Sequence, residues 1–179
     1  MRIRLYTLLV LFLISSFIFV SASFSTDRLI DVRYEQLTKD AKIQIDCLAD
    51  NIYHEAGYEP DQGKVAVALV TMNRVQDPRY PKDICSVVKQ KTRIHSIGDR
   101  RITCQFSWFC EDKKTNRQKT AYEESRDIAL HVYANYEKIK DFTNGALFYH
   151  ADYVNPQWRG LERTTVIGRH IFYKEKAKL

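Results

Sequence analysis

The run Asn51-Ile52-Tyr53-His54-Glu55-Ala56-Gly57-Tyr58 sets the architecture of this 179-residue chain. Read backwards at helical spacing, Glu55, Ile52 and Leu48 share one face, and Ile45 lies a turn earlier, so an acid ends an apolar stripe. The helix should stop at Gly57. Removing water from a carboxyl group disfavours its charged form and raises its pKa, which suits a general acid. We therefore expect Glu55 to lie at the edge of the core.

Two other interpretations of Glu55 compete with this one. The carboxylate of a helix end is commonly solvated at the surface, although the polar-tipped rings of Tyr53, His54 and Tyr58 and the nearby chain break favour a cleft here. His54-Glu55 also begins the H-E-x-x-H zinc pattern, but its fifth position is Tyr58, so the second ligand is missing. We expect no metal and no other cofactor.

The N-terminus has the three parts of an export signal. Arg2 and Arg4 precede an uncharged stretch, residues 5–24, which is most apolar over residues 8–20 and is followed by small residues. We expect residues 1–22 to be a signal peptide that is cleaved after Ala22. The uncharged stretch is also just long enough to remain as a membrane anchor. Either outcome places the body in the periplasm, the cell envelope or the extracellular space.

The four cysteines agree with an exported domain. They are Cys47, Cys85, Cys104 and Cys110, and no C-x-x-C pair occurs among them. In a short exported chain such residues form disulfides more often than a metal site, and three pairings are open. An alternative is a cysteine-dependent amidase that uses Cys104 or Cys110 with a histidine.

The charge is basic, with a net value of +6 that falls to +4 when Arg2 and Arg4 are removed. Basic residues gather at Lys89, Lys91, Arg93, Arg100 and Arg101, and again at Lys113, Lys114, Arg117 and Lys119. Such clusters are usually solvated loops, but they suit a polyanionic partner such as an anionic membrane or the acidic bacterial wall. An export signal argues against nucleic acid as the partner, and we expect a monomer.

The elements predicted along the chain give an α+β fold. After a linker over residues 23–40, helices are expected over 41–56, over 61–76 with Asp61 as its cap, from Pro81 with Ile84, Val87 and Val88 facing inward, and over 120–136. Residues 89–103 should form an exposed basic loop. Strands are expected over 146–151 and 164–173, the latter divided by a turn at Gly168-Arg169. Asn73-Arg74 should clamp a helix end.

Taken in order, many short segments resemble the cell wall hydrolase family typified by the spore cortex-lytic enzyme SleB. The resemblance covers roughly residues 47–173. It is carried by Cys47-Leu48-Ala49, Asn51-Ile52-Tyr53-His54-Glu55-Ala56, Glu59, Gly63, Val65-Ala66-Val67-Ala68, Asn73-Arg74-Val75, Tyr80-Pro81, Ile84-Cys85, Val87-Val88, Gln105-Phe106-Ser107-Trp108, Phe148-Tyr149-His150-Ala151, Val154-Asn155-Pro156, Trp158, Ile167-Gly168 and His170-Ile171-Phe172-Tyr173.

The resemblance implies a lysozyme-like catalytic domain over residues 41–179, with a mainly helical body and a small antiparallel sheet near the C-terminus. It implies cleavage of peptidoglycan between N-acetylmuramic acid and N-acetylglucosamine, with Glu55 as the catalytic residue. The family usually has Glu-Ala-Arg-Gly-Glu where this chain has Glu55-Ala56-Gly57-Tyr58-Glu59, so Gly57-Tyr58 alters the local loop. This departure supports the alternative of a peptidoglycan-binding protein without catalysis.

A single acid suffices for such a reaction. Glu55 would protonate the glycosidic oxygen and then take a proton either from the sugar's own C6 hydroxyl, which gives a 1,6-anhydro product, or from water. Aromatic faces, amides and hydroxyls suit a sugar groove, so the expected substrate-binding residues are Gln105, Phe106, Ser107, Trp108, Tyr149, His150, Trp158 and Glu59. Because Tyr149 and His150 alternate on a strand, we expect at most one of them to face the groove.

Overall fold

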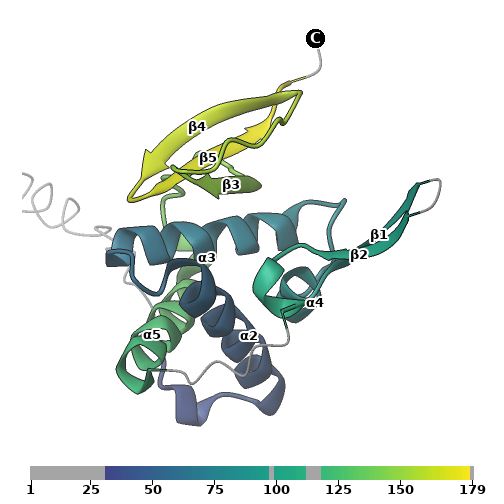
Figure 1. The fold of residues 1–179 in the computed structure, drawn as a ribbon. Coiled ribbons are helices and arrows are strands. Elements are labelled where there is room, and N and C mark those ends of the chain that lie inside the picture. Colours follow the sequence, from purple (N-terminus) through teal and green to yellow (C-terminus); the bar gives the residue numbers. More distant parts are fainter. Residues whose placement is uncertain (1–30, 97–98, 112–117, 178–179) are drawn as a thin grey trace, which may run out of the picture.

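The computed structural model describes residues 31–96, 99–111 and 118–177, and the predicted signal segment 1–22 lies outside these ranges. A helical body carries a three-stranded sheet on one side, and a separate two-stranded hairpin extends from it (Figure 1). The helices are α2 (Lys39–Ala56), α3 (Asp61–Gln76), α4 (Ile84–Val88) and α5 (Lys119–Asn135), with short 3-10 turns at Tyr34–Gln36, Ser107–Phe109 and Tyr136–Lys138. This arrangement confirms the predicted fold class.

The predicted apolar stripe on α2 forms the centre of the core. Ile45, Leu48 and Ile52 are completely buried, and they pack with side chains from α3, α4 and α5. Among these are Leu69 of α3 and Val132 of α5, which are also completely buried. The helix ends at Ala56 as predicted, so the packing of the stripe holds Glu55 at one end of the core.

The beginnings of the helices differ from the prediction because other residues cap them. Helix α2 begins at Lys39, since Thr38 Oγ1 accepts a hydrogen bond from Ala41 N at 3.2 Å. Asp61 is the first residue of α3 and not its cap, a position held by Pro60. Helix α4 begins at Ile84 and not at Pro81, because the Asp83 side chain accepts from Ser86 N at 2.8 Å. The inward-facing residues predicted for α4 are all buried.

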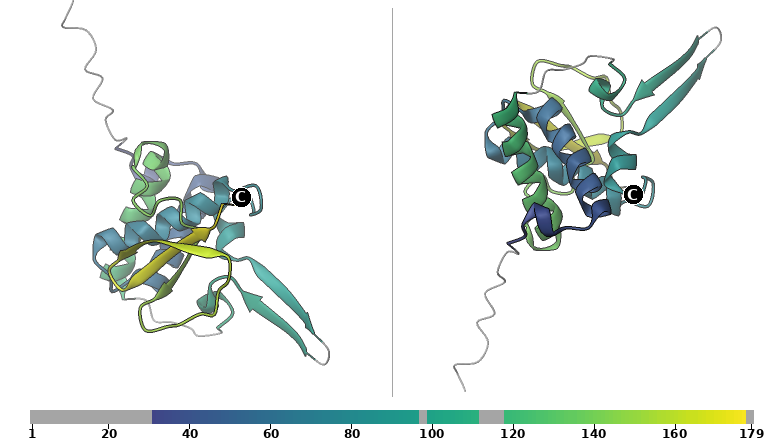
Figure 2. Two further views of the ribbon diagram at one scale, coloured as in Figure 1. Left: turned by 90° about the horizontal axis from the view of Figure 1, so that it is seen from above. Right: turned by 90° about the horizontal axis from the view of Figure 1, so that it is seen from below.

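The predicted basic loop over residues 89–103 is wrong. The strands β1 (Lys91–Ser96) and β2 (Asp99–Cys104) pair in antiparallel register from Lys91 opposite Cys104 to Ser96 opposite Asp99. The two strands extend away from the helical body in every view (Figure 2). Lys91 and Arg93 of β1 are exposed.

The C-terminal sheet follows the prediction closely. Strands β3 (Phe148–Ala151), β4 (Leu161–Ile167) and β5 (His170–Glu175) form an antiparallel sheet in the order β3-β5-β4. Gly168 and Arg169 form the turn between β4 and β5, as predicted. Phe172 and Ile167 point into a second core cluster with Ala66 and Val70, so this sheet packs on α3.

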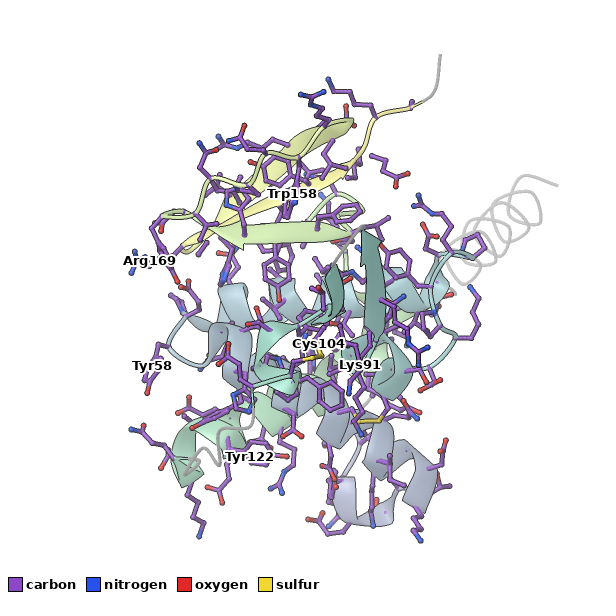
Figure 3. The ribbon with its side chains drawn as sticks, turned by 45° about the vertical axis from the view of Figure 1, so that its right-hand side comes forward. Tyr58, Lys91, Cys104, Tyr122, Trp158 and Arg169 are labelled. Atoms are coloured by element: carbon purple, nitrogen blue, oxygen red, sulfur yellow. A yellow bond between two sulfur atoms is a disulfide. The ribbon has the colours of Figure 1, made fainter. Side chains whose placement is uncertain are left out.

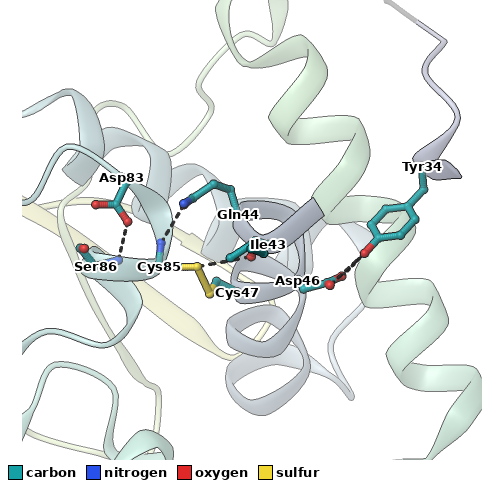
Figure 4. The surroundings of a disulfide bond; sticks show 8 residues. All are labelled: Tyr34, Ile43, Gln44, Asp46, Cys47, Asp83, Cys85 and Ser86. Atoms are coloured by element: carbon teal, nitrogen blue, oxygen red, sulfur yellow. Dashed lines mark hydrogen bonds between the residues drawn. A yellow bond between two sulfur atoms is a disulfide. The ribbon is translucent and has the colours of Figure 1, made fainter. Parts of the chain in front are cut away.

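The cysteines form two disulfides. Cys47 of α2 bonds to Cys85 of α4 with a Cα–Cα distance of 5.2 Å, and Cys104 bonds to Cys110. Figure 4 shows the first bond, beside which Gln44 accepts a hydrogen bond from Cys85 N at 3.0 Å. All four cysteines are therefore in disulfides, which removes the free thiol that the amidase alternative required as its nucleophile.

Within residues 31–96, 99–111 and 118–177, no helix has the length and hydropathy needed to cross a bilayer.

Candidate active site

Glu55 lies in the last turn of α2 and is half-buried. Burial raises the pKa of its carboxyl group above the ordinary value, and the negative charge of Glu111 raises it further. A hydrogen bond from Tyr149 and the positive charge of Arg74 oppose this rise, but burial is the largest contribution to the pKa of Glu55. The carboxyl group thus stays protonated to a higher pH than a solvated glutamate would.

Tyr149 and Arg74 link Glu55 to distant parts of the chain. Tyr149 of β3 donates its hydroxyl hydrogen to Glu55 Oε2 at 3.2 Å, and burial raises the pKa of this phenol well above its usual value. Arg74 of α3 is 2% exposed, and its Nε donates to Leu147 O at 2.8 Å. Burial lowers the pKa of Arg74, whereas the neighbouring Glu55 raises it.

A groove of about 760 Å³ opens in front of Glu55. Its walls come from α2, from the segment around the 3-10 turn Ser107–Phe109, and from the edge of the C-terminal sheet. The residues that line it are His54, Glu55, Ser107, Trp108, Phe109, Glu111, Tyr149, His150, Ala151, Tyr153, Val154 and His170. An acid with a raised pKa in a groove of aromatic and polar side chains is suited to proton transfer to a bound sugar.

The wall opposite the sheet is fixed through Trp108. Its ring stacks on His54 with 4.4 Å between the centroids, and its Nε1 donates to Asn51 Oδ1 at 3.2 Å. Asn51 is completely buried and donates to Thr71 Oγ1 at 3.2 Å. The Cys104–Cys110 disulfide closes the short segment that carries Trp108, so this wall is held by both a covalent and a hydrogen-bonded link.

The structure brings five of the predicted site residues together in the groove, and these are Glu55, Ser107, Trp108, Tyr149 and His150. Both Tyr149 and His150 line it, contrary to the expectation that at most one would do so. The reason is that β3 is the edge strand of its sheet, and the groove runs along that edge, which side chains from both faces reach.

The four other predicted site residues lie outside the groove lining. Phe106 is 4% exposed and belongs to the core. The Gln105 amide, when oriented with its oxygen toward Arg74, accepts from both terminal nitrogens of Arg74 at 3.2 Å. Glu59 accepts a hydrogen bond from Arg169 N at 3.1 Å, which ties it to the turn between β4 and β5. Trp158 is 44% exposed and packs on the sheet outside the groove lining. Each contact follows from tertiary packing that local spacing does not encode.

Sequence reasoning missed several residues that line the groove. His54 directly precedes Glu55, and Glu111 directly follows Cys110, so their positions in the sequence were the available signal. His170 is 7% exposed, and burial lowers the pKa of its imidazole, so it is neutral at neutral pH.

Asn73 does clamp a helix end, since its amide donates to Asp141 Oδ2 at 3.0 Å and to Ala146 O at 3.1 Å.

Across the described portion of the chain, no three His, Cys, Asp or Glu side chains gather in the way that ligands of a metal ion do. At His54-Glu55 the ring of His54 stacks on Trp108, as described above.

Comparison with known proteins places the chain in a family. The model of the family described as "Cell Wall Hydrolase" matches residues 58–173, which begin just after Glu55. The chain belongs to the cell wall hydrolase family. The spore cortex-lytic enzyme of Bacillus subtilis (strain 168) is 27% identical over 127 residues, which are 70% of this chain and 35% of that protein. The spore cortex-lytic enzyme of Halalkalibacterium halodurans is 34% identical over 58 residues, or 32% of this chain and 18% of that protein. This member of the family therefore spans about a third of the length of the Bacillus subtilis relative.

Two solved structures share the fold of this cell wall hydrolase. The catalytic domain of Bacillus cereus SleB matches with a TM-score of 0.51 and 23% identity, over 78% of this chain and 94% of that one. The catalytic domain of the germination-specific lytic transglycosylase SleB from Bacillus anthracis matches with a TM-score of 0.53 and 25% identity, over 78% and 98%. The helical body with its small C-terminal sheet is therefore the SleB catalytic fold.

Proposed function

We propose that this protein cleaves the glycan strands of peptidoglycan between N-acetylmuramic acid and N-acetylglucosamine, with Glu55 as the catalytic residue. The observation that carries the proposal is the half-buried Glu55 carboxyl group, with its raised pKa, facing a groove of about 760 Å³. Membership of the cell wall hydrolase family and the similarity to a lytic transglycosylase support it.

In the proposed mechanism Glu55 serves first as an acid and then as a base. Its proton moves to the bridging oxygen, the bond from that oxygen to the sugar C1 breaks, and positive charge develops on the ring. The resulting carboxylate then accepts a proton from the C6 hydroxyl, whose oxygen closes a 1,6-anhydro ring, or from water, which gives hydrolysis. Tyr149 holds the carboxyl group during both transfers through its hydrogen bond to Oε2.

The remaining groove residues would bind the sugars. Trp108 presents an aromatic ring that is held by Asn51 and His54, and Ser107 supplies a hydroxyl group close to it. Rings cover the apolar faces of sugars, while hydroxyl and imidazole groups bind their polar edges. On the opposite wall the ring of His150 would cover an apolar sugar face, while Tyr149 holds Glu55.

Replacing Glu55 with Gln tests the assignment, because the amide keeps the shape of the side chain but cannot donate the proton. We expect release of soluble glycan from purified peptidoglycan to fall at least about 100-fold. Glu137→Gln, which changes an exposed carboxylate outside the groove, is the matched control and should keep full activity. Unchanged turnover in the Glu55 variant would eliminate the proposal. Mass spectrometry of the products distinguishes the anhydro product, which is lighter by one water.

The alternative is a peptidoglycan-binding protein without catalysis, which the altered Gly57-Tyr58 loop suggested. Gly57 has helical dihedral angles of φ −57° and ψ −27°, and the Tyr58 side chain is 91% exposed. The substitution therefore leaves Glu55 inside its helix, which favours catalysis. Binding to peptidoglycan without new reducing or anhydro ends would support the alternative.

The proposed substrate also sets the compartment. We propose that the protein is exported to the periplasm, the cell envelope or the outside through residues 1–22, and acts there as a monomer. The two disulfides support an oxidising location. Cell fractionation and determination of the mature N-terminus test export, cleavage after Ala22 and retention as an anchor.

A further inference from the structure

The outward face of the C-terminal sheet carries a cluster of aromatic side chains at β3 and β5, although the outer face of such a sheet is usually polar. Phe148 of β3 lies opposite Tyr173 of β5, and His150 lies opposite Ile171. Tyr149 and Phe172, which alternate with these residues along the strands, contact the core. Alternation therefore places Phe148, His150, Ile171 and Tyr173 on the other face of the sheet. We call Phe148, His150, Tyr173 and the adjoining Trp158 the outer aromatic face.

Trp158 completes this face from the segment between β3 and β4. Its ring centroid lies 6.1 Å from that of Phe148, 5.5 Å from that of His150 and 5.7 Å from that of Tyr173. It remains 44% exposed despite these contacts. Figure 3 shows Trp158 on the sheet, away from Tyr58 at the corner between α2 and α3. A large ring is thus held against three others while part of it stays open to solvent.

The polar atoms of His150 and Tyr173 already have hydrogen-bond partners within the protein. His150 Nδ1 lies 2.8 Å from Ala151 O, which can only accept, so Nδ1 carries the proton. Nε2 is then the acceptor for the Tyr173 hydroxyl group at 3.0 Å. The His150 and Tyr173 rings stack with 5.3 Å between their centroids. The rings are therefore preorganised, which lowers the entropy cost of binding a ligand on them.

The outer aromatic face continues directly from the groove. His150 belongs to both, and Ala151 next to it also lines the groove. A groove of about 760 Å³ is of the size that encloses a drug-sized ligand. A glycan strand is a polymer, so the sugars beyond the cleavage point must leave the groove and lie on the neighbouring surface.

We propose that the outer aromatic face is an accessory binding site for the N-acetylated sugars of a glycan strand that extends out of the groove past His150. The ligand class rests on the proposed function, while the site itself shares only His150 with the groove around Glu55. The partly exposed ring of Trp158 is the contact surface for an apolar sugar face.

Binding and cleavage are separated by working in a Glu55→Gln background. Trp158→Ala in this background should weaken binding to long, soluble glycan strands about threefold to tenfold, the range for one aromatic contact. Its affinity for short N-acetylglucosamine oligomers that fill only the groove should stay unchanged. Trp158→Phe should restore most of the affinity for long strands, because a ring is again present. Isothermal titration calorimetry measures both ligands.

Tyr58→Ala is the matched control, since it removes another exposed ring that lies outside the groove and the outer aromatic face. It should bind both ligands like the parent protein. Equal affinity of Trp158→Ala and its parent for long strands would overturn the accessory site, as would an equal loss for short oligomers. Loss of concentration-dependent self-association in Trp158→Ala, with glycan binding intact, would overturn it in favour of an interface between two copies. Cleavage by the wild-type protein is assayed separately, so failure of the proposed function is recognised independently.

Discussion

The protonation of Glu55 depends on the burial of its carboxyl group and on three neighbouring side chains. Burial and Glu111 raise the pKa of its carboxyl group, whereas Tyr149 and Arg74 lower it. His54 and His170 also line the groove, and burial keeps His170 neutral. A general acid works in its protonated form, so activity should be lost as the pH rises through the pKa of Glu55.

Replacing Glu111 with Gln should move the alkaline limb of the pH profile of kcat/KM to lower pH. The substitution removes a negative charge that disfavours ionisation of Glu55, so the pKa of Glu55 falls. Activity well below this limb should change less than about threefold, since a modest electrostatic change leaves the groove intact. Glu137→Gln again serves as the control, and a limb that does not move would show that Glu111 has no influence on the acid.

Tyr149→Phe should move the same limb in the opposite direction. The lost hydrogen bond favours the ionised carboxylate, so its removal raises the pKa of Glu55. Because a net hydrogen bond contributes about 1 kcal/mol, we expect kcat to fall roughly fivefold through poorer positioning of Glu55. The pH profile separates this effect from a general loss of folding, which would lower activity at all pH values alike.

At the scale of elements, the two disulfides should have different consequences. Cys47 and Cys85 join α2 to α4 across 38 residues, and loop entropy assigns such a bond about 4 kcal/mol of stability, against about 2 kcal/mol for the six-residue separation of Cys104 and Cys110. Replacing Cys47 and Cys85 by Ser should therefore lower the melting temperature more.

Replacing Cys104 and Cys110 by Ser should instead reduce activity more strongly, because this bond closes the segment that carries Ser107 and Trp108. The double variants are compared by melting temperature and by turnover at a temperature where both are folded. Equal activity losses in the two variants would contradict the assigned role of the second bond.

The turn between β4 and β5 should not tolerate a side chain at its glycine. Gly168 has a φ of +55°, and a Cβ atom there would collide with the Glu59 carboxylate that binds Arg169 N. Gly168→Ala should cost about 2 kcal/mol of stability, from backbone strain and displacement of Glu59. Gly145→Ala is a useful comparison, since Gly145 has a φ of +75° with nothing near its missing Cβ. Urea unfolding of both variants isolates the contribution of the collision.

Elements with a strong local pattern were predictable, and those without one were not. The apolar stripe and glycine break gave the end of α2, and Gly168-Arg169 gave the turn of the C-terminal sheet. The hairpin of β1 and β2 was mistaken for a loop because its sequence is rich in charged residues and lacks a regular alternation of apolar and polar residues. Lys91 and Arg93 are exposed. The two strands are joined by antiparallel pairing from Lys91 opposite Cys104 to Ser96 opposite Asp99, a contact that the sequence pattern does not reveal.

At the scale of the whole molecule, Arg74 connects parts of the chain that are distant in sequence. It lies on α3, donates to Leu147 O before β3, binds Gln105 after β2, and places its charge near Glu55. Arg74→Lys keeps the charge but loses the planar geometry of these bonds, so it should destabilise the protein by about 2 kcal/mol. Arg79→Lys, at an exposed ion pair with Asp77 and Glu175, should cost less than about 1 kcal/mol. The urea midpoints, with unchanged m values, measure both; equal costs would contradict this role of Arg74.

The candidate site was predictable only where one element carried the signal. Glu55 followed from the pattern of a single helix, and the segment of Ser107 and Trp108 from its residue types. The residues that influence Glu55 come from α3, from β3 and from the segment after Cys110, so Arg74 gave no sign of its role in the sequence and Glu111 gave only its position beside Cys110. Glu59 and Gln105 looked suited to sugar binding, but tertiary contacts use their polar groups elsewhere.

The order of the disulfides has a consequence for how the chain matures. Cys47 pairs with Cys85 and Cys104 pairs with Cys110, so the first cysteine bonds to the second and the third to the fourth. An oxidant that joins thiols in the order in which they leave a translocation channel would make both native bonds at once, with no mispaired species to reshuffle. Cells that lack a disulfide isomerase should therefore still accumulate the exported protein with both native bonds, which non-reducing peptide mapping would detect.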